Sequence, residues 1–85
     1  MYELIFKKPA EKFYKKLDVL NKRRLNKVFD SMTENGLNNL DCRSLQGQYK
    51  GLYRIRIGDI RIIIFLKEKQ VIEILTINYR GNAYK

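Results

Sequence analysis

The chain begins with a period-two pattern of apolar residues. Tyr2, Leu4 and Phe6 occupy every second position, and the alternation stops where Lys7 and Lys8 follow. This period is typical of a β-strand, because successive side chains point to opposite faces of a sheet. The pattern predicts a strand over residues 2–6.

The apolar spacing then becomes helical. Pro9 suits the first turn of a helix, where its missing N–H is not needed. We expect a first helix over about residues 9–19, with one apolar face. The residues that form this face are Ala10, Phe13, Leu17 and Leu20.

A second helical pattern follows directly. Asn21 is a suitable N-cap and Gly36 a suitable residue to end the helix. Its apolar residues fall at i, i+3, i+4 and i+7, and they are Leu25, Val28, Phe29 and Met32. The two helices are expected to form a hairpin, and each needs a sheet to cover its apolar stripe.

The second half of the chain predicts strands. Residues 37–50 are mostly polar and indicate a connecting loop anchored by Leu40 and Leu45. Three β-patterns follow, over residues 52–57, 60–66 and 71–77. The expected fold class is α+β with the order β-α-α-β-β-β, as one domain over residues 1–85. A helical hairpin would pack on one face of a mostly antiparallel four-stranded sheet.

The Gly58-Asp59 pair predicts a two-residue hairpin, which fixes the register of its strands. Arg56 then lies opposite Arg61, and Arg54 lies opposite Ile63. One face becomes almost purely apolar and is the expected core face, with Tyr53, Ile55, Ile57, Ile60, Ile62, Ile64 and Leu66. The other face carries Arg54, Arg56, Arg61, Ile63 and Phe65.

The facing of the last strand is open in the sequence. Depending on the loop before it, the set of Val71, Glu73 and Leu75 or the set of Ile72, Ile74 and Thr76 faces the helices. We favour the second set, because it keeps the carboxylate of Glu73 out of the core, where an unpaired charge is costly.

Composition narrows the chemistry. The 85 residues carry 18 Lys and Arg against 9 Asp and Glu, a net charge of +9, with no histidine and one cysteine. Without histidine or a second cysteine, metal-dependent chemistry is not expected, and no cofactor is predicted. The lone Cys42 indicates a packing or surface residue rather than a disulfide. No signal peptide or membrane-spanning segment is evident, so we expect a cytoplasmic protein.

The arginines of the second face favour an anionic partner. Like charges directly opposite each other destabilise a strand pair, and guanidinium groups bind phosphate oxygens bidentately. Aromatic rings nearby would stack on unpaired bases, as in single-stranded RNA recognition. The sequence therefore predicts an RNA-binding surface, to which the C-terminal segment adds Arg80 and Tyr84. The further expected RNA contacts are Lys50, Phe65, Tyr79 and Lys85.

The motif Y-R-I-R-x-G-D-x-R-I-I over residues 53–63, followed by Arg80 and a closing Tyr84, resembles the RelE/ParE superfamily of prokaryotic toxins. Leu45-Gln46-Gly47 and the order of elements extend the resemblance over nearly the whole chain. The resemblance implies a small toxin that is neutralised by an antitoxin. The RelE branch cleaves messenger RNA in the ribosomal A site without a metal, whereas the ParE branch inhibits DNA gyrase.

The resemblance also implies site residues. It assigns the catalytic positions of RelE-type ribonucleases to Arg54, Arg56, Arg61, Arg80 and Tyr84. RelE-like enzymes often have lysines at the first two positions, and arginine is a poor general base because it keeps its proton. A related pattern has histidine where this chain has Tyr79. Catalysis would then be slow, or would depend on the ribosome to align the substrate.

The first hypothesis is a ribosome-dependent mRNA endoribonuclease. The alternatives are a ParE-like gyrase inhibitor and a degenerate member that binds RNA or antitoxin without cleavage. The expected partners are a RelB-like antitoxin, the ribosome and mRNA. Binding to a membrane or to a metal is not expected. Ribosomal RNA contacts would come from basic helix residues, which are Lys12, Lys15, Lys16, Lys22, Arg23 and Arg24.

Overall fold

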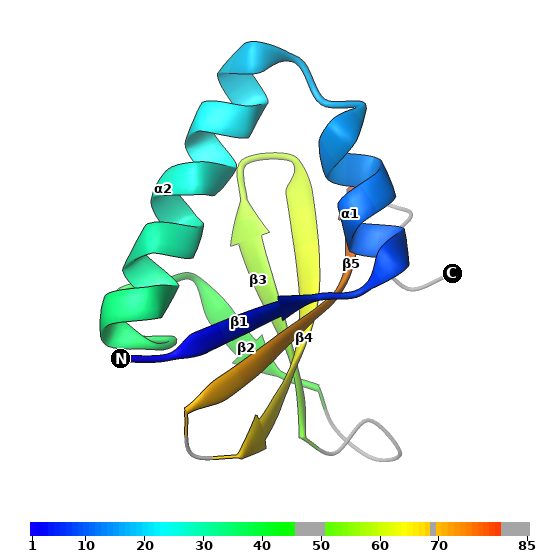
Figure 1. Ribbon diagram of the computed structural model, residues 1–85. Coiled ribbons are helices and arrows are strands. Elements are labelled where there is room, and N and C mark those ends of the chain that lie inside the picture. The colour runs from blue at the N-terminus through cyan, green and yellow to red at the C-terminus, as the bar shows by residue number, and fades with distance from the viewer. Residues whose placement is uncertain (46–50, 69, 81–85) are drawn as a thin grey trace.

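The computed structural model describes residues 1–45, 51–68 and 70–80, which form an α+β fold (Figure 1). The elements are β1 (Glu3–Phe6), α1 (Lys8–Lys15), α2 (Val19–Asn35), β2 (Cys42–Ser44), β3 (Leu52–Ile57), β4 (Ile60–Glu68) and β5 (Val71–Tyr79). The strands form one sheet in the order β1-β5-β4-β3-β2. The β1–β5 pair is parallel and the other pairs are antiparallel.

The sheet has one strand more than the sequence predicted. β2 lies within the expected loop and pairs antiparallel with β3, with Arg43 opposite Arg54. The predicted four-stranded sheet is therefore a five-stranded mixed sheet. The sequence pattern did not predict this short strand because polar residues surround it. Leu40 and Cys42 nevertheless alternate with Asp41 and Arg43, as in a strand. The α+β class and the helical hairpin are confirmed.

The helix boundaries differ from the expected ones. α1 ends at Lys15, because the N–H groups of Lys16 and Leu17 bond three residues back and tighten the last turn. α2 begins at Val19 with Asp18 at the N-cap position, so the prediction that Asn21 caps it is wrong. Leu20 consequently belongs to α2 and is 65% exposed rather than part of the first helix's apolar face.

Gly36 ends α2 as predicted. Its φ is +66°, its N–H donates to the carbonyl oxygen of Met32 at 2.9 Å, and a Cβ there would lie 2.6 Å from the Tyr2 ring. A side chain at this position would therefore meet both backbone strain and the ring. The glycine lets the chain leave the helix while Tyr2, just before β1, packs beneath it.

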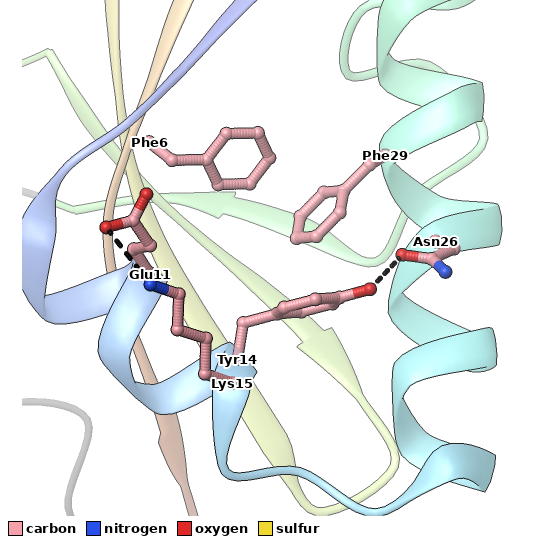
Figure 2. Close-up of a pocket in the computed structure, with 6 residues that line it drawn as sticks. All are labelled: Phe6, Glu11, Tyr14, Lys15, Asn26 and Phe29. Atoms are coloured by element: carbon pink, nitrogen blue, oxygen red, sulfur yellow. Dashed lines mark hydrogen bonds and ion pairs between the residues drawn. The ribbon is translucent and has the colours of Figure 1, made fainter.

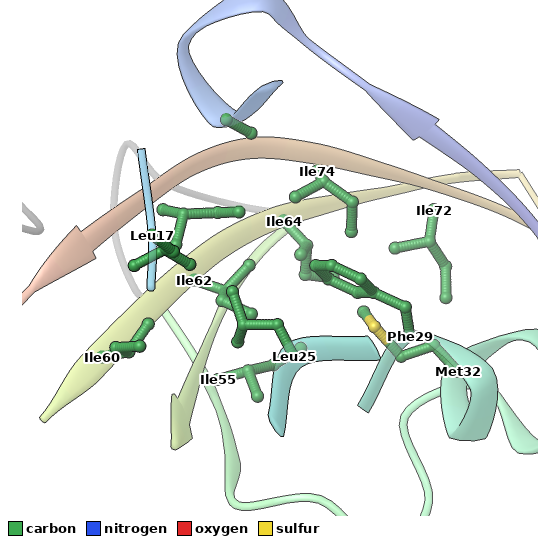
Figure 3. Packing of buried hydrophobic residues seen from close by; sticks show 12 residues of the cluster. Leu17, Leu25, Phe29, Met32, Ile55, Ile60, Ile62, Ile64, Ile72 and Ile74 are labelled. Carbon is green, nitrogen blue, oxygen red and sulfur yellow. The ribbon is translucent and has the colours of Figure 1, made fainter. Parts of the chain in front are cut away.

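The core lies between the sheet and both helices (Figure 3). Its sheet residues include Ile55, Ile60, Ile62 and Ile64, all fully buried, which confirms the predicted core face of the β3–β4 hairpin. The helices contribute Ala10, Leu25, Phe29 and Met32, and the turn between them contributes Leu17. Because these side chains all join one cluster, the opposite face of the sheet, here called the outer face, is left for other contacts.

The facing of β5 changes within the strand. Ile72 and Ile74 are buried as expected, but the β4–β5 register shifts between Ile63 and Ile64, which leaves Leu75 as an extra residue. After this bulge Ile77, not Thr76, occupies the core. The prediction for Thr76 is therefore wrong, since it pairs with Ile63 on the outer face. Among the described residues, no helix is long and apolar enough to cross a membrane.

Candidate nucleic-acid interface

Four arginines lie on the outer face and form what we call the basic face: Arg43, Arg54, Arg56 and Arg61. The predicted hairpin register is confirmed, with Arg56 opposite Arg61 and Arg54 opposite Ile63. Arg43 on β2 joins Arg54 from the other side. Paired residues on neighbouring strands have Cβ atoms about 5 Å apart, so these guanidinium groups reach a common surface.

The row nearest the hairpin turn contains a carboxylate as well. Asp41 precedes β2, and its Oδ2 accepts a hydrogen bond from Nε of Arg56 at 2.7 Å. On the other side Arg61 lies between Arg56 and Asn78. The expected anion beside the Arg56–Arg61 pair is thus supplied in part by the chain itself. Sequence reasoning missed Asp41 because its segment was interpreted as loop.

Arg61 is held by the turn that precedes β4. Its Nη1 donates to the carbonyl oxygens of Gly58 at 2.8 Å and of Ile60 at 3.2 Å. These bonds hold its guanidinium against the backbone of the hairpin turn. Arg61 is half-buried, whereas Arg56 is exposed. The two cations therefore share a cross-strand pair without sharing an acceptor.

The second row consists of Arg43, Arg54, Ile63 and Thr76. Ile63 is only 8% exposed, although it points away from the helices. Arg43 is exposed and Arg54 is half-buried. Sequence reasoning found Arg54 and missed Arg43, because Arg43 gains its position only from the pairing of β2 with β3. In this row the apolar side chain of Ile63 therefore lies beside the charges of the basic face.

The outer face becomes apolar farther from the turn, where Leu52 pairs with Phe65 and Phe65 pairs with Glu73. The ring of Phe65 lies against Gly51, where a Cβ would be 2.7 Å from it. One side of this predicted base-stacking ring is therefore covered by backbone. The Glu73 side chain is 12% exposed and lies 3.7 Å from the Nζ atoms of Lys7 and Lys67. Glu73 stays out of the core, as expected.

The C-terminal site residues lie in different places. Arg80 is exposed, and its N–H donates to the carbonyl oxygen of Asp59 at 2.7 Å, which places it at the hairpin turn. Tyr79 pairs with Ile60, and its ring packs edge-on against Phe13 with centroids 5.2 Å apart. Tyr79 therefore lies toward α1, away from the basic face. The predicted residues Lys50, Tyr84 and Lys85 lie outside the described residues.

Cys42 points to the core side of β2 and packs against the core cluster. Burial raises the pKa of its thiol, and the negative charge of Asp41 raises this pKa further, while Arg54 lowers it. A raised pKa leaves little thiolate at neutral pH, so Cys42 is a poor nucleophile.

The helical hairpin carries the basic residues that were expected to contact ribosomal RNA. Lys12, Lys15, Lys16, Arg23 and Arg24 are exposed. Lys15 pairs with Glu11 at 4.0 Å, and Lys22 lies over the ring of Tyr14, 5.7 Å from its centroid. These contacts are weak and solvent-exposed, which leaves the charges available to a polyanion.

A pocket of about 420 Å³ opens between β1 and the two helices (Figure 2). Its apolar lining comes from Phe6, Tyr14 and Phe29, and the Phe6 and Phe29 rings meet edge-on at 4.9 Å. The hydroxyl of Tyr14 donates to Oδ1 of Asn26 at 2.7 Å and so links the helices. Phe6 is 40% exposed. The pocket is thus a second surface feature, on the helical side of the sheet.

Residues 4–84 match the family model of the ParE toxin of the type II toxin-antitoxin system, parDE. The chain belongs to this toxin family. It is a member of the RelE/ParE superfamily, as its motifs indicated. A comparison with curated proteins gives no significant match.

Solved structures of type II toxins have the same fold. One match is a chain of the archaeal RelE-RelB complex from Pyrococcus horikoshii OT3. It is 30% identical to this chain with a TM-score of 0.80, and the match covers 96% of this chain and 98% of that chain. A chain of the RelB-RelE antitoxin-toxin complex from Methanococcus jannaschii has 23% identity and a TM-score of 0.78, with 94% of each chain covered.

A third match comes from the heterotetrameric YoeB-YefM toxin-antitoxin complex of Staphylococcus aureus. It has 21% identity and a TM-score of 0.75, and it covers 94% of this chain and 98% of that chain. This toxin of the RelE/ParE superfamily therefore has the expected fold, with β2 added to the sheet.

Proposed function

We propose that this toxin is a ribosome-dependent endoribonuclease that arrests translation by cutting messenger RNA. The observation that carries the proposal is the basic face, where arginines from three neighbouring strands lie together beside the apolar side chain of Ile63. Such a surface matches the phosphates of a single RNA strand. We place its action in the cytoplasm, where translation takes place.

The proposed reaction is attack of an RNA 2′-oxygen on the adjacent phosphorus. The O2′–P bond forms, the P–O5′ bond breaks, the 2′-hydroxyl loses its proton and the leaving 5′-oxygen gains one. The products are a 2′,3′-cyclic phosphate and a 5′-hydroxyl. Negative charge gathers on the phosphoryl oxygens in the transition state, where fixed cations contribute most.

We assign that electrostatic role to Arg61 and Arg80. The guanidinium of Arg61 bonds to the carbonyl oxygen of Gly58, and the backbone N–H of Arg80 bonds to that of Asp59, so both residues lie at the hairpin turn. Arg54 and Arg56 would bind flanking phosphates. Arginine side chains act as fixed charges rather than proton acceptors. Tyr84 remains the proposed group for stacking on the nucleotide or for proton transfer.

Ribosome dependence follows from the same chemistry. A site built from arginines aligns phosphate but does not itself fix the 2′-oxygen in line for attack, and alignment is worth several powers of ten in rate. The ribosome holds messenger RNA in a fixed path. Ribosomal RNA would be contacted by the basic residues of the helical hairpin, which are Lys12, Lys15, Lys16, Lys22, Arg23 and Arg24.

The second candidate function is inhibition of DNA gyrase, and the match to the ParE family model favours it. The RelE reading is supported by the 30% identity to a chain of the archaeal RelE-RelB complex. Because one fold serves both activities, the site must decide. Inhibition of gyrase by binding alone does not require several arginines on an open sheet face, whereas cleavage of RNA does require cations at the phosphate.

Purified toxin added to translating ribosomes, and separately to naked message and to gyrase, would test the proposal. We expect cuts within translated codons, mapped by primer extension, with 5′-hydroxyl ends that polynucleotide kinase labels directly. Intact message in an arrested translation reaction would overturn the nuclease. Loss of gyrase supercoiling with unbroken message would support the ParE-like function instead.

We also propose a RelB-like antitoxin as the neutralising partner. An amphipathic helix would fit the apolar pocket lined by Phe6, Tyr14 and Phe29. Lys15 in the lining and Lys22 over the Tyr14 ring would favour acidic residues on that helix. An acidic or extended segment would cover the basic face. A Phe6→Asp variant should weaken the complex at least tenfold by calorimetry while leaving cleavage intact, whereas unchanged affinity would exclude this docking site.

A further inference from the structure

Asp41 lies at the edge of the basic face, directly beside Arg56. Two contacts join them: Nε of Arg56 donates to Oδ2 of Asp41 at 2.7 Å, and the N–H of Arg56 donates to the carbonyl oxygen of Asp41 at 2.9 Å. The backbone bond extends the β2–β3 ladder by one residue. The backbone bond therefore fixes the position of Asp41 relative to the sheet, and its short side chain leaves the carboxylate few conformations.

This contact uses only one side of the guanidinium. Arginine carries five N–H donors in a planar fork, and Asp41 takes the donor on Nε. Within the described part of the chain, the two Nη groups of Arg56 make no hydrogen bond. The Arg56 side chain is 50% exposed. A phosphate can therefore bind at the Nη groups while the bond to Asp41 stays intact.

The carboxylate also determines where Arg56 turns under the repulsion from Arg61. Arg56 faces Arg61 across the β3–β4 pair, and like charges in this position repel. Arg61 is tied to the hairpin turn, so Arg56 is the partner with freedom to rotate away. The hydrogen bond to Asp41, on the β2 side of β3, fixes the direction in which the Arg56 guanidinium turns away from Arg61.

We propose that Asp41 is a positioning residue of the ribonuclease site. Its carboxylate holds the guanidinium of Arg56 so that the Nη groups meet an RNA phosphate, and it keeps this contact when RNA binds. The inference rests on the proposed function. Asp41 acts through Arg56 and does not itself touch the reacting atoms.

A carboxylate that only screened the basic face would have the opposite effect. Its removal would strengthen RNA binding and would leave cleavage unchanged or faster. A positioning carboxylate predicts that binding and cleavage separate. Asp41→Ala should lower the single-turnover rate constant on saturating ribosome-bound message by about ten- to a hundredfold, because small misplacements are costly. Affinity for uncleavable RNA should not fall.

Two further variants isolate the mechanism. Asp41→Asn keeps an oxygen that accepts from Nε of Arg56, so it should recover most of the cleavage rate. Asp41→Ala combined with Arg56→Ala should be no slower than Arg56→Ala alone, because the residue through which Asp41 acts is gone. Asp30→Ala on the exposed side of α2 is the matched control, with the same change in net charge.

Two cleavage outcomes would overturn the inference. One is an Asp41→Ala variant that cuts message as fast as the unmodified toxin. The other is an equal further loss when Asp41→Ala is added to Arg56→Ala, which would mean that Asp41 acts independently of Arg56. Circular dichroism of each variant would show whether the fold is retained.

A nuclear magnetic resonance measurement separates this inference from the proposed function. The Nε–H signal of Arg56, assigned by its loss in Arg56→Lys, should exchange slowly with water and should exchange fast in Asp41→Ala. It should persist when a short 2′-O-methyl RNA is added. Loss of the signal on adding RNA would show that phosphate displaces Asp41, and would overturn the inference even if the toxin cuts message. If the unmodified toxin leaves message intact, the proposed function fails, and this signal still reports the contact.

Discussion

Arg56 and Arg61 face each other across β3 and β4, and their guanidinium groups bond to different acceptors. Arg56 bonds to Asp41, while Arg61 bonds to the carbonyl oxygens of Gly58 and Ile60. Each member of the like-charged pair is thus held by its own acceptor, Arg56 by a carboxylate beside β2 and Arg61 by the backbone of the turn. Donors remain on both groups for an outside anion, and their placement does not depend on that anion.

Arg61→Ala should remove most of the activity with little effect on the fold. Loss of one fixed cation at a developing negative charge typically costs about a hundredfold or more in rate. The bonds of Arg61 to the turn are partly exposed, so the free energy of unfolding should fall by only about 1 kcal/mol. Growth after induction, primer extension and urea unfolding would measure both effects.

Lys27→Ala is the control for the Arg61 substitution. Lys27 is an exposed cation of α2, so its removal matches the change in charge away from the basic face. The control should arrest growth as the unmodified toxin does. An Arg61→Ala toxin that still cuts message at the normal rate would remove Arg61 from the site.

Arg43 should contribute to RNA affinity through charge alone. It extends the row of Arg54 to the edge of the sheet and is exposed. Each phosphate contact to a single strand adds about 0.7 to the slope of log affinity against log salt. Arg43→Ala should therefore weaken binding at low salt and reduce this slope by about that amount, by fluorescence anisotropy with a labelled oligonucleotide. An unchanged slope would place Arg43 outside the interface.

The β3–β4 hairpin was predictable because its local chemistry determines its geometry. A Gly58-Asp59 turn fixes the register, and the register separates Ile55 and Ile62 from Arg54 and Arg56. The positions of these arginines therefore follow from spacing alone. Because Arg54 and Arg56 are two residues apart on one strand, they also share a face of the sheet, as expected for two residues of the candidate site.

Features that depend on distant pairing were not predictable in this way. β2 is three residues long and becomes a strand only by adding to β3, so Asp41 and Arg43 looked like loop residues. The bulge at Leu75 arises from the fit of β5 to β4, and it places Ile77 in the core where Thr76 was expected. Tyr79 consequently points toward Phe13 rather than the arginines.

The bulge makes a prediction about stability. Ile77 is 1% exposed, so Ile77→Ala should lower the free energy of unfolding by about 2–5 kcal/mol. Leu75 is half-buried, and Leu75→Ala should cost only about 1 kcal/mol. Urea denaturation of both variants would measure the difference. Equal losses would contradict the shifted register.

Thr76 provides a complementary test of the same strand. Its Oγ1 is buried and has no hydrogen-bond partner among the described residues. A buried hydroxyl without a partner is destabilising, so Thr76→Val should leave the free energy of unfolding unchanged or raise it slightly. A loss of more than about 1 kcal/mol would show that the hydroxyl is satisfied in solution.

Cys42 should report the charge of its neighbours through its reactivity. Burial and Asp41 raise the pKa of the thiol and Arg54 lowers it, so alkylation at pH 7–8 should be slower than for an exposed cysteine. Its rate should rise at higher pH than usual, because only the thiolate reacts. Asp41→Asn removes a charge that raises the pKa and should speed alkylation at fixed pH, whereas Arg54→Ala should slow it. All variants should react equally in urea, where these charges no longer surround the thiol, and a slower Asp41→Asn would contradict the placement of Asp41 beside Cys42.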